Sequence, residues 1–188
     1  MLPEQIRTFR EVVTLKDGTH VLLRPMTPED RPHLDELYLS AADEDVRYLR
    51  HNVKDPAVLQ KWCDTLNYHQ VLPMLALVKD RAVGNCSLHF FTGPKRHIGE
   101  IRIFLSREFR NRGLGTKMIR VVVDLARRQG LSILLAEITA DQLKVIHAFE
   151  QIGFKQRCIL ENFFMFPDGD CVDVVLMTMD LRPRGEEF

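Results

Sequence analysis

The amino-acid sequence predicts an α/β fold in which helices flank one mixed β-sheet. Three observations lead to this fold class. An amphipathic helix over 114–128 lies between two apolar strands, the βαβ arrangement that makes neighbouring strands parallel. Two further pairs of apolar runs, within 73–91 and 156–180, are each joined by a short polar turn and predict antiparallel hairpins. At 188 residues, the chain has the length of one ordinary domain.

The first expected elements are one strand and one helix. Residues 21–23 form an apolar run that follows the turn residues Asp17 and Gly18 and is stopped by Pro25, which cannot donate to a sheet. Thr27 is expected to cap the next helix, with Pro28 at the first helical position. The apolar side of this helix consists of Leu34, Leu37, Tyr38 and Ala41.

A polar loop over 42–54 separates this helix from a second one, which begins at Asp55-Pro56. The apolar side of the second helix consists of Val58, Leu59, Trp62, Cys63 and Leu66. Two apolar runs follow, at 73–78 and 82–91, and the polar residues 79–81 between them predict a hairpin.

The βαβ unit is expected over 98–138. Its first strand covers about 98–105, and its helix alternates apolar and basic residues at the helical period until Gly130 ends it. Residues 133–138 are an almost unbroken apolar run, as expected for a strand covered on both faces. We therefore predict that the two strands are parallel neighbours.

The C-terminal part is expected to add one helix and two strands. Residues 139–142, Thr-Ala-Asp-Gln, match a capping box that opens a helix ending at Ile152 before Gly153. Strands near 156–166 and 171–180 then complete the sheet.

Composition argues against several classes of protein. Residues 1–188 contain no linker or repeat, so we expect one domain with its core at about 20–180 and a frayed tail at 182–188. The 26 basic residues balance the 26 acidic ones, which argues against binding nucleic acid or an anionic membrane through overall charge. The four cysteines lack zinc-site spacing, so no metal is expected. With no leader and no run long enough to span a bilayer, a cytoplasmic protein is expected.

Residues 110–116, Arg-Asn-Arg-Gly-Leu-Gly-Thr, are a candidate anion site between a strand and the amphipathic helix. The first N–H groups of a helix have no partner within it, and the helix dipole favours negative charge there. Gly113 and Gly115 let a phosphate approach the backbone closely. From Arg107 to Arg128 there are seven basic and two acidic residues. The alternative is an ordinary strand-to-helix turn followed by a basic helix face in water.

The spacing of these residues excludes two familiar phosphate loops. A Walker A loop needs a glycine five residues before the Gly of its Gly-Lys pair, and neither that glycine nor that pair is present at Gly115. A Rossmann fingerprint would have its third glycine where Met118 stands.

The segment resembles the acyl-CoA pyrophosphate motif of the GNAT superfamily of N-acyltransferases, Arg/Gln-x-x-Gly-x-Gly/Ala. Residues 149–154 are similar to that family's tyrosine-x-x-x-glycine-phenylalanine helix ending, with Phe149 in the tyrosine place. The resemblance covers about 20–180. Residues 23–30 and 48–50 are most similar to the acetyltransferase domain of bacterial protein-lysine acetyltransferases. The resemblance implies a mixed, mostly antiparallel sheet with one splayed parallel strand pair and flanking helices.

The resemblance further implies that acetyl-CoA is bound as a co-substrate, without a metal. The implied contacts are the backbone of Ile103, Phe104 and Leu105 along pantetheine, residues Arg110, Asn111, Arg112, Gly113, Leu114, Gly115 and Thr116 around the diphosphate, and Gln142 and Phe149. Many family members use a tyrosine to protonate the leaving thiolate, and Phe149 cannot donate a proton. The thiolate then leaves without an acid, or His147 acts as a substitute acid. The alternative for His147 is an ordinary surface residue.

A base is also needed, because an amine must be neutral to attack a thioester and a free lysine has a pKa of about 10.4. Glu100 lies 13 residues before Gly113, as the catalytic glutamate does in the bacterial protein acetyltransferases. The structural alternative is an ion pair with Arg102 on the same face of the strand. A strand bulge, which the family often has, would re-aim the side chain. Glu137 on the neighbouring strand is the reserve base.

The sequence therefore predicts an N-acetyltransferase that moves an acetyl group from acetyl-CoA to a primary amine, on a protein lysine or a small molecule, by direct attack in a ternary complex. Residues 43–45, Asp-Glu-Asp, either attract the cationic amine or form a solvated acidic loop or helix start. The alternative function is a non-catalytic acyl-CoA-binding regulatory module, and a third is an interaction domain with an empty loop. The oligomeric state, a homodimer included, stays open.

Overall fold

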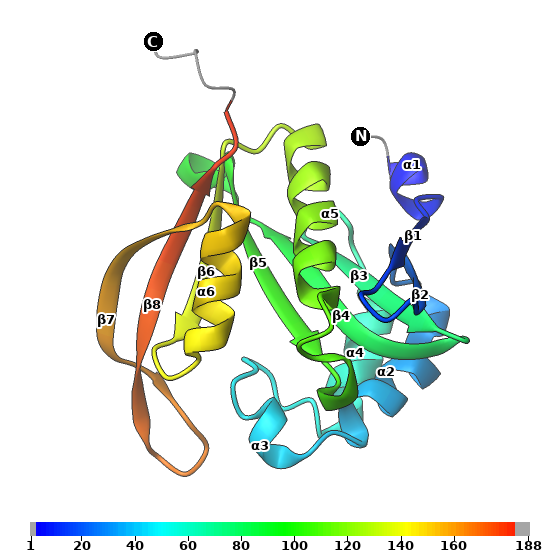
Figure 1. Cartoon of the computed structure of the whole chain (residues 1–188), viewed down its shortest axis with the longest axis horizontal. Helices are drawn as coiled ribbons and strands as arrows, with labels where there is room; N and C mark the ends of the chain where they lie inside the picture. The colour runs from blue at the N-terminus through cyan, green and yellow to red at the C-terminus, as the bar shows by residue number, and fades with distance from the viewer. Residues whose placement is uncertain (1–2, 183–188) are drawn as a thin grey trace.

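The computed structural model describes residues 3–182, and one eight-stranded sheet runs through them (Figure 1). In spatial order the strands are β1 (Glu11–Thr14), β2 (His20–Pro25), β3 (Val71–Val78), β4 (Arg81–Phe90), β5 (Ile98–Leu105), β6 (Ile133–Thr139), β8 (Cys171–Asp180) and β7 (Lys155–Met165). All neighbours pair antiparallel except β5 and β6, which are parallel. The predicted fold class is confirmed.

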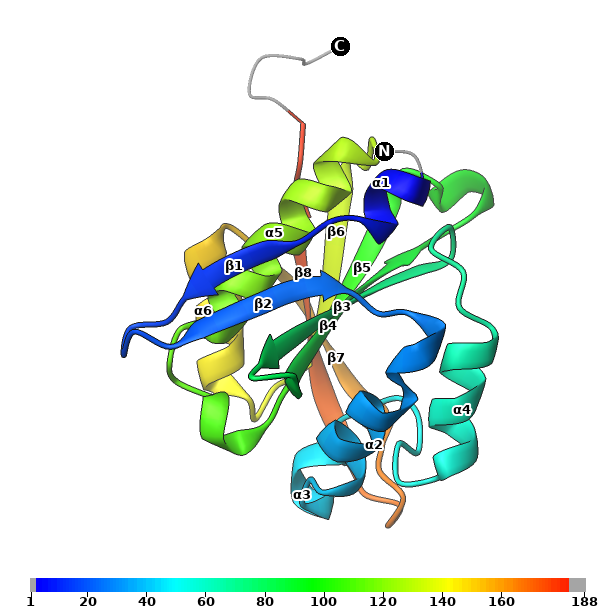
Figure 2. The ribbon, with the colours of Figure 1, turned by 90° about the vertical axis from the view of Figure 1, so that its right-hand side faces the viewer.

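Helices cover both faces of this sheet (Figure 2). On one face lie α5 (Leu114–Arg128) and α6 (Leu143–Ile152), and on the other lie α2 (Arg31–Leu39) and α4 (Pro56–Asp64). The short elements are α1 (Pro3–Arg7), α3 (Asp43–Val46) and the 3₁₀ turns Pro28–Asp30, Gly93–Lys95 and Arg107–Phe109.

The strict alternation of β3 shows how the sheet divides the core in two. Met74 and Ala76 pack into the cluster beneath α5 and α6, whereas Leu75 and Leu77 pack into the cluster beneath α2 and α4. Both faces of this central strand are therefore buried, which explains why its sequence is a continuous apolar run.

The parallel pair β5–β6 separates part of the way along its length. Its pairing covers Ile98↔Ile133, Gly99↔Leu134 and Glu100↔Leu135, although β5 continues to Leu105 and β6 to Thr139. The two strands therefore diverge just beyond Glu100, and this splayed pair creates an opening in the middle of the sheet.

Most predicted elements are present, and the differences have local causes. The predicted helix start at the capping box 139–142 is wrong: β6 continues to Thr139, which pairs with β8, and α6 begins at Leu143. The polar loop 42–54 contains the one-turn helix α3. The sequence pattern did not predict α1 or β1. The expected frayed tail falls, apart from Arg182, outside the described residues.

Other observations concern the chemistry of the described residues. Cys63 and Cys86 are free and buried, and Cys158 and Cys171 are free and exposed. Within residues 3–182, no three or more His, Cys, Asp or Glu side chains are grouped so as to hold a metal ion. No helix in the same range combines the length and apolar character that crossing a bilayer requires.

Candidate functional site

A groove of about 760 Å³ opens where β5 and β6 diverge. The predicted cofactor-binding residues that line it are Ile103, Phe104, Leu105, Arg110, Asn111, Gly113, Gly115, Thr116, Gln142 and Phe149. Two predicted residues do not line it. Leu114 is fully buried in the core, and Arg112 is directed away to Asp17 and Thr19.

The backbone of β5 offers free hydrogen-bonding groups to this groove. The bonds Phe91 N→Ile98 O and Ser106 N→Val83 O show that the even-numbered residues of β5 direct their N–H and C=O groups to β4. The odd-numbered Ile103 and Leu105 therefore direct theirs to the other side, where β6 has already diverged. The N–H and C=O groups of Phe104 are directed to β4, so they are not free for a ligand in the groove.

The N-terminus of α5 closes one end of the groove. Gly113 precedes the helix with φ of +86°, a left-handed conformation that glycine adopts without strain. The first intrahelical bond is Lys117 N→Gly113 O, which leaves the N–H groups of residues 114–116 without a helical acceptor. An anion at this end of α5 would meet three backbone donors and the positive end of the helix dipole.

Two arginines that follow β5, Arg107 and Arg110, form ion pairs with α3. Arg110 donates to Leu105 O at 3.1 Å and to Asp45 Oδ1 at 2.6 Å, and Arg107 pairs with both Asp45 and Glu44. Burial raises the pKa of Asp45, but hydrogen bonds from Arg110 and Arg107 outweigh burial and lower it overall. Residues 43–45 form the first turn of α3, so the helix start named as one alternative is confirmed. The pairing of Glu44 and Asp45 with Arg107 and Arg110 was not predicted from the sequence.

Glu100 lies at the point where the strands separate, with its side chain 5% exposed. Its two carboxylate oxygens accept from Arg102 Nε and Nη2, each at 3.0 Å, so the ion pair named as the structural alternative is present. The expected bulge is absent, because β4 and β5 pair without a register shift from Gly84↔Leu105 to Phe90↔Gly99. Glu100 itself does not line the groove; its role as the base stays a prediction.

Arg50 bridges the two carboxylates on the diverging strands. Its Nη2 lies 2.6 Å from Glu100 Oε1 and 2.5 Å from Glu137 Oε2. Burial raises the pKa of Glu100, but Arg102, Arg50 and the nearby His89 together lower it below its usual value. Sequence reasoning assigned no site role to Arg50, since a single arginine in a polar loop gives no periodic or spacing signal.

A second missed residue is Lys16, in the turn between β1 and β2. Two of its side-chain carbons lie 3.9 Å from the position that a Cβ on Gly113 would occupy, so the side chain of this cationic residue lies beside the candidate anion site. No local sequence pattern predicts this contact, because Lys16 and Gly113 are far apart in the chain and are brought together only by the fold of the sheet.

The residues discussed for thiolate protonation lie at α6. Phe149 is buried, packs edge-on against Phe154 with ring centroids 5.0 Å apart, and has no proton to donate. Gln142 Nε2 donates to Thr139 Oγ1 at 2.9 Å and so faces the groove in a fixed orientation. The His147 side chain is 69% exposed and bonds to Gln151, as a surface residue does.

Comparison with known proteins agrees with this geometry. Residues 20–155 match the model of the acetyltransferase (GNAT) domain, which covers more than two-thirds of the chain. This chain belongs to the GNAT acetyltransferase family. An acetyltransferase of Pseudomonas aeruginosa is 29% identical over 136 residues, which are 63% of this chain and 66% of that protein, just under two-thirds of its length.

Solved GNAT structures share the fold. The GNAT domain of PAT from S. lividans has a TM-score of 0.77 at 18% identity and covers 96% of this chain and 99% of that one. The Salmonella typhimurium protein yncA, solved with its cofactor acetyl-CoA, has a TM-score of 0.74 at 17% identity, covering 88% and 96%. At these identities the likeness concerns the fold, so the similarity to protein-lysine acetyltransferases stays a prediction.

Proposed function

We propose that this GNAT chain transfers the acetyl group of acetyl-CoA to a primary amine by direct attack in a ternary complex. The observation that carries the proposal is the groove between β5 and β6, where the unpaired edge of β5 meets a helix N-terminus whose first N–H groups have no helical acceptor. These two features suit the two ends of one ligand, an amide-containing arm and a diphosphate. The relative solved with acetyl-CoA supports this choice of co-substrate.

The diphosphate is assigned to the N-terminus of α5. The N–H groups of residues 114–116 would donate to it, and Gly113 and Gly115 add no side chain beyond the backbone. Arg110 is held by Asp45 and Leu105 O, and Arg112 by Asp17, so the backbone supplies most of the binding groups. Lys16 adds a positive charge from outside the groove.

The pantetheine arm is assigned to the edge of β5. Its amides would bond the N–H and C=O groups of Ile103 and Leu105 as an added strand does. The thioester would then lie close to Glu100, where the strands separate, and a backbone N–H of β5 there would stabilise the oxyanion of the tetrahedral intermediate.

Proton transfer from the amine is assigned to Glu100, with Glu137 as the reserve base. Glu100 is held as a carboxylate by Arg102 and Arg50, whereas Glu137 lines the groove directly. Because Arg50 and Arg102 cover Glu100, the proton would reach it through a water molecule. The nitrogen lone pair then bonds to the carbonyl carbon, and the C–S bond breaks.

The leaving thiolate needs no acid in this scheme. A thiol pKa is about 8.5, so the thiolate is a good leaving group and takes its proton from solvent. This agrees with Phe149, which lines the groove and has no proton to donate.

A non-catalytic acyl-CoA-binding regulatory module is the second candidate function. Two observations favour it: Phe149 has no proton to give, and Arg50 and Arg102 cover Glu100. The two functions make the same prediction for binding and opposite predictions for turnover.

Two assays test the proposed function. Acetyl-CoA should raise the melting temperature in proportion to the logarithm of its concentration. Release of free CoA thiol should then depend on an added amine, chosen from a panel of small amines and lysine peptides. Absence of a thermal shift at millimolar acetyl-CoA would remove the proposal, and a shift without turnover of any amine would favour the regulatory module.

A further inference from the structure

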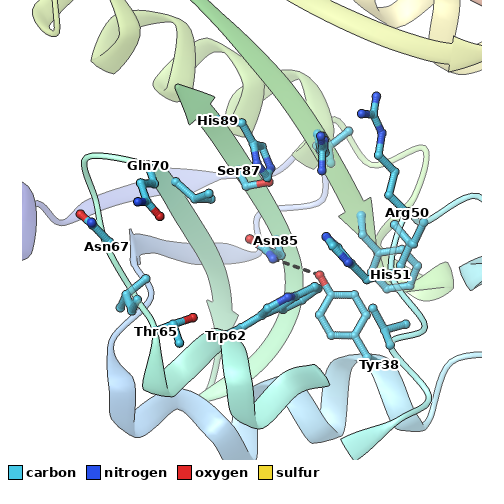
Figure 3. Close-up of a pocket in the computed structure, with 17 residues that line it drawn as sticks. Tyr38, Arg50, His51, Trp62, Thr65, Asn67, Gln70, Asn85, Ser87 and His89 are labelled. Atoms are coloured by element: carbon cyan, nitrogen blue, oxygen red, sulfur yellow. Dashed lines mark hydrogen bonds between the residues drawn. The ribbon is translucent and has the colours of Figure 1, made fainter. Parts of the chain in front are cut away.

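A second cavity, of about 280 Å³, lies on the α2 and α4 side of the sheet (Figure 3). Five residues line both this cavity and the groove, so the two spaces meet at β5: Leu49, Arg50, Arg102, Ile103 and Phe104. A molecule held there would therefore lie next to the place where the acyl end of a CoA thioester is proposed to sit. None of the loop residues 110–116 lines this cavity.

The floor of this cavity, which we call the acceptor cavity, is polar. Antiparallel pairing places Asn85 opposite Phe104, Ser87 opposite Arg102 and His89 opposite Glu100. Because side chains alternate along a strand, all six point to the same face. The Asn85 amide Nδ2 donates to the Tyr38 hydroxyl at 3.0 Å, while its Oδ1 is buried and has no partner among the described residues.

The walls of the acceptor cavity are aromatic. Tyr38 and His51 each meet Trp62 edge-on, with ring centroids 5.8 and 5.7 Å apart (Figure 3). Figure 3 shows these three rings on one side and Ser87 and His89 across from them. The cavity thus combines flat apolar walls with a floor of hydrogen-bonding groups, as small-molecule sites do.

The charged groups that line the acceptor cavity are guanidinium groups. Arg50 and Arg102 line it, and no aspartate or glutamate of residues 3–182 does. Burial, with Arg102 adding to it, lowers the pKa of His89 to about 4, and burial also lowers the pKa of His51. Near neutral pH both imidazoles are therefore uncharged, and the lining has positive and neutral groups.

Arg102 lines the cavity and retains hydrogen-bonding capacity. Its Nε and Nη2 donate to Glu100, and Nη1 makes no hydrogen bond within the described part of the chain. The Glu100 pair holds the guanidinium plane in place, which suits it to a planar oxyanion. A second ammonium group would find no carboxylate in this lining.

We propose that the acceptor cavity binds a small primary amine that carries a carboxylate, with the carboxylate on Arg102 and the amine directed toward the shared opening. The inference rests on the proposed acetyl transfer and names its acceptor class. The amine nitrogen bonds to the thioester carbonyl carbon, the C–S bond breaks, and sulfur leaves with the electron pair. The proton that nitrogen loses passes through water to Glu100, and the leaving sulfur takes a proton from solvent. Because the lining has no free carboxylate, it also favours the neutral amine over its ammonium form.

The test compares matched acceptors in the CoA-release assay: glycine with glycinamide, phenylalanine with phenylalaninamide, and spermidine. An amide has the lower amine pKa, so an unselective site would acetylate it faster. We expect kcat/KM at least tenfold higher for the acids than for their amides, and no turnover of spermidine. Amides or spermidine turned over as well as the acids, or no acetylation of either acid, would overturn the inference.

Variants of Arg102 separate this inference from the proposed function. In Arg102→Gln the acid-to-amide ratio should fall at least tenfold, mainly through KM for the acid, while the acetyl-CoA thermal shift stays. Arg102→Lys should retain part of the ratio, because charge remains but the planar fork is lost. Arg157→Gln, on β7 and bonded to Thr178, is the control for loss of an arginine. An unchanged acid-to-amide ratio in Arg102→Gln would refute the assignment of Arg102 to the carboxylate. Absence of an acetyl-CoA thermal shift in the parent protein would instead refute the proposed function.

Discussion

Two glycines at opposite ends of α5 allow a matched test of the anion site. Gly113 before the helix has φ of +86° and Gly130 after it has φ of +79°. A Cβ at Gly130 would meet no atom within 4 Å, and one at Gly113 would meet Lys16 carbons at 3.9 Å, so neither site clashes. Alanine at either position therefore brings the same penalty, the left-handed backbone, of about 1–2 kcal/mol. In a chain of this length that lowers the melting temperature by about 2–8 °C.

Of the two glycines, only Gly113 lines the groove, so only its substitution should weaken acetyl-CoA binding. At acetyl-CoA of about 100 times Kd, binding stabilises the parent protein by about 2.7 kcal/mol, or about 5–11 °C. A methyl group at Gly113, and the change in loop geometry that relieves its strain, should weaken binding at least tenfold. The stabilisation then falls to about 1.4 kcal/mol or less, roughly half of the parental shift.

The assay is a thermal melt of Gly113→Ala, Gly130→Ala and the parent, each over a series of acetyl-CoA concentrations. We expect equal losses of stability without ligand, and a reduced ligand shift for Gly113→Ala alone. Equal ligand shifts in both variants would show that the diphosphate does not lie on this turn. A reduced shift in both would point to a general effect of strain in α5.

Three further predictions follow from the charged groups. Glu100→Gln should show the same acetyl-CoA thermal shift as the parent but a lower acetylation rate, most of all at low pH where the amine is protonated. An acetylation rate equal to that of the parent, or a larger loss of rate in Glu137→Gln, would contradict the assignment of Glu100 as the base. Asp30→Asn should destabilise the fold by about 3–5 kcal/mol, which lowers the melting temperature by about 6–20 °C, because the Asp30 side chain is 3% exposed and accepts from Nη1 and Nη2 of Arg24. The acetyl-CoA shift of this variant should remain, since Asp30 lies outside the groove. The free energy of unfolding should fall on acidification below about pH 4. Burial raises the pKa of Asp30, but Arg24 and the Thr27 N–H outweigh burial and lower it overall. The stabilisation by Asp30 is therefore present above the pKa of the unfolded state and is lost as the pH drops through the lower pKa of the folded state. Urea melts from pH 3 to 7 should show that slope, reduced in Asp30→Asn, and identical slopes would exclude this source.

The elements that sequence predicts well are those whose signals are local. The helix at 114–128 has an apolar stripe, a glycine at each end and strands on both sides, and the structure places it at Leu114–Arg128. Asp55 likewise caps α4, accepting from Ala57 N at 2.8 Å as its position before Pro56 predicts. By contrast, β1 is four residues long and exposed except for Val13, so its pairing with β2 leaves no apolar pattern to detect.

The same distinction explains why the groove is predictable and the acceptor cavity is not. The anion site is continuous in the chain, because a helix N-terminus and its preceding turn are built from neighbouring residues. The acceptor cavity draws on α2, α4, two loops and strands β3, β4 and β5, and each of its polar residues has an ordinary local role. Glu100 shows the consequence: alternation predicts its pair with Arg102, but Arg50, from a loop fifty residues earlier, decides how far the carboxylate is covered. Arg50 and Arg102 both border the groove and the cavity, so Arg102, which we propose selects the acceptor, lies where the two spaces meet, and long-range contacts place both arginines there.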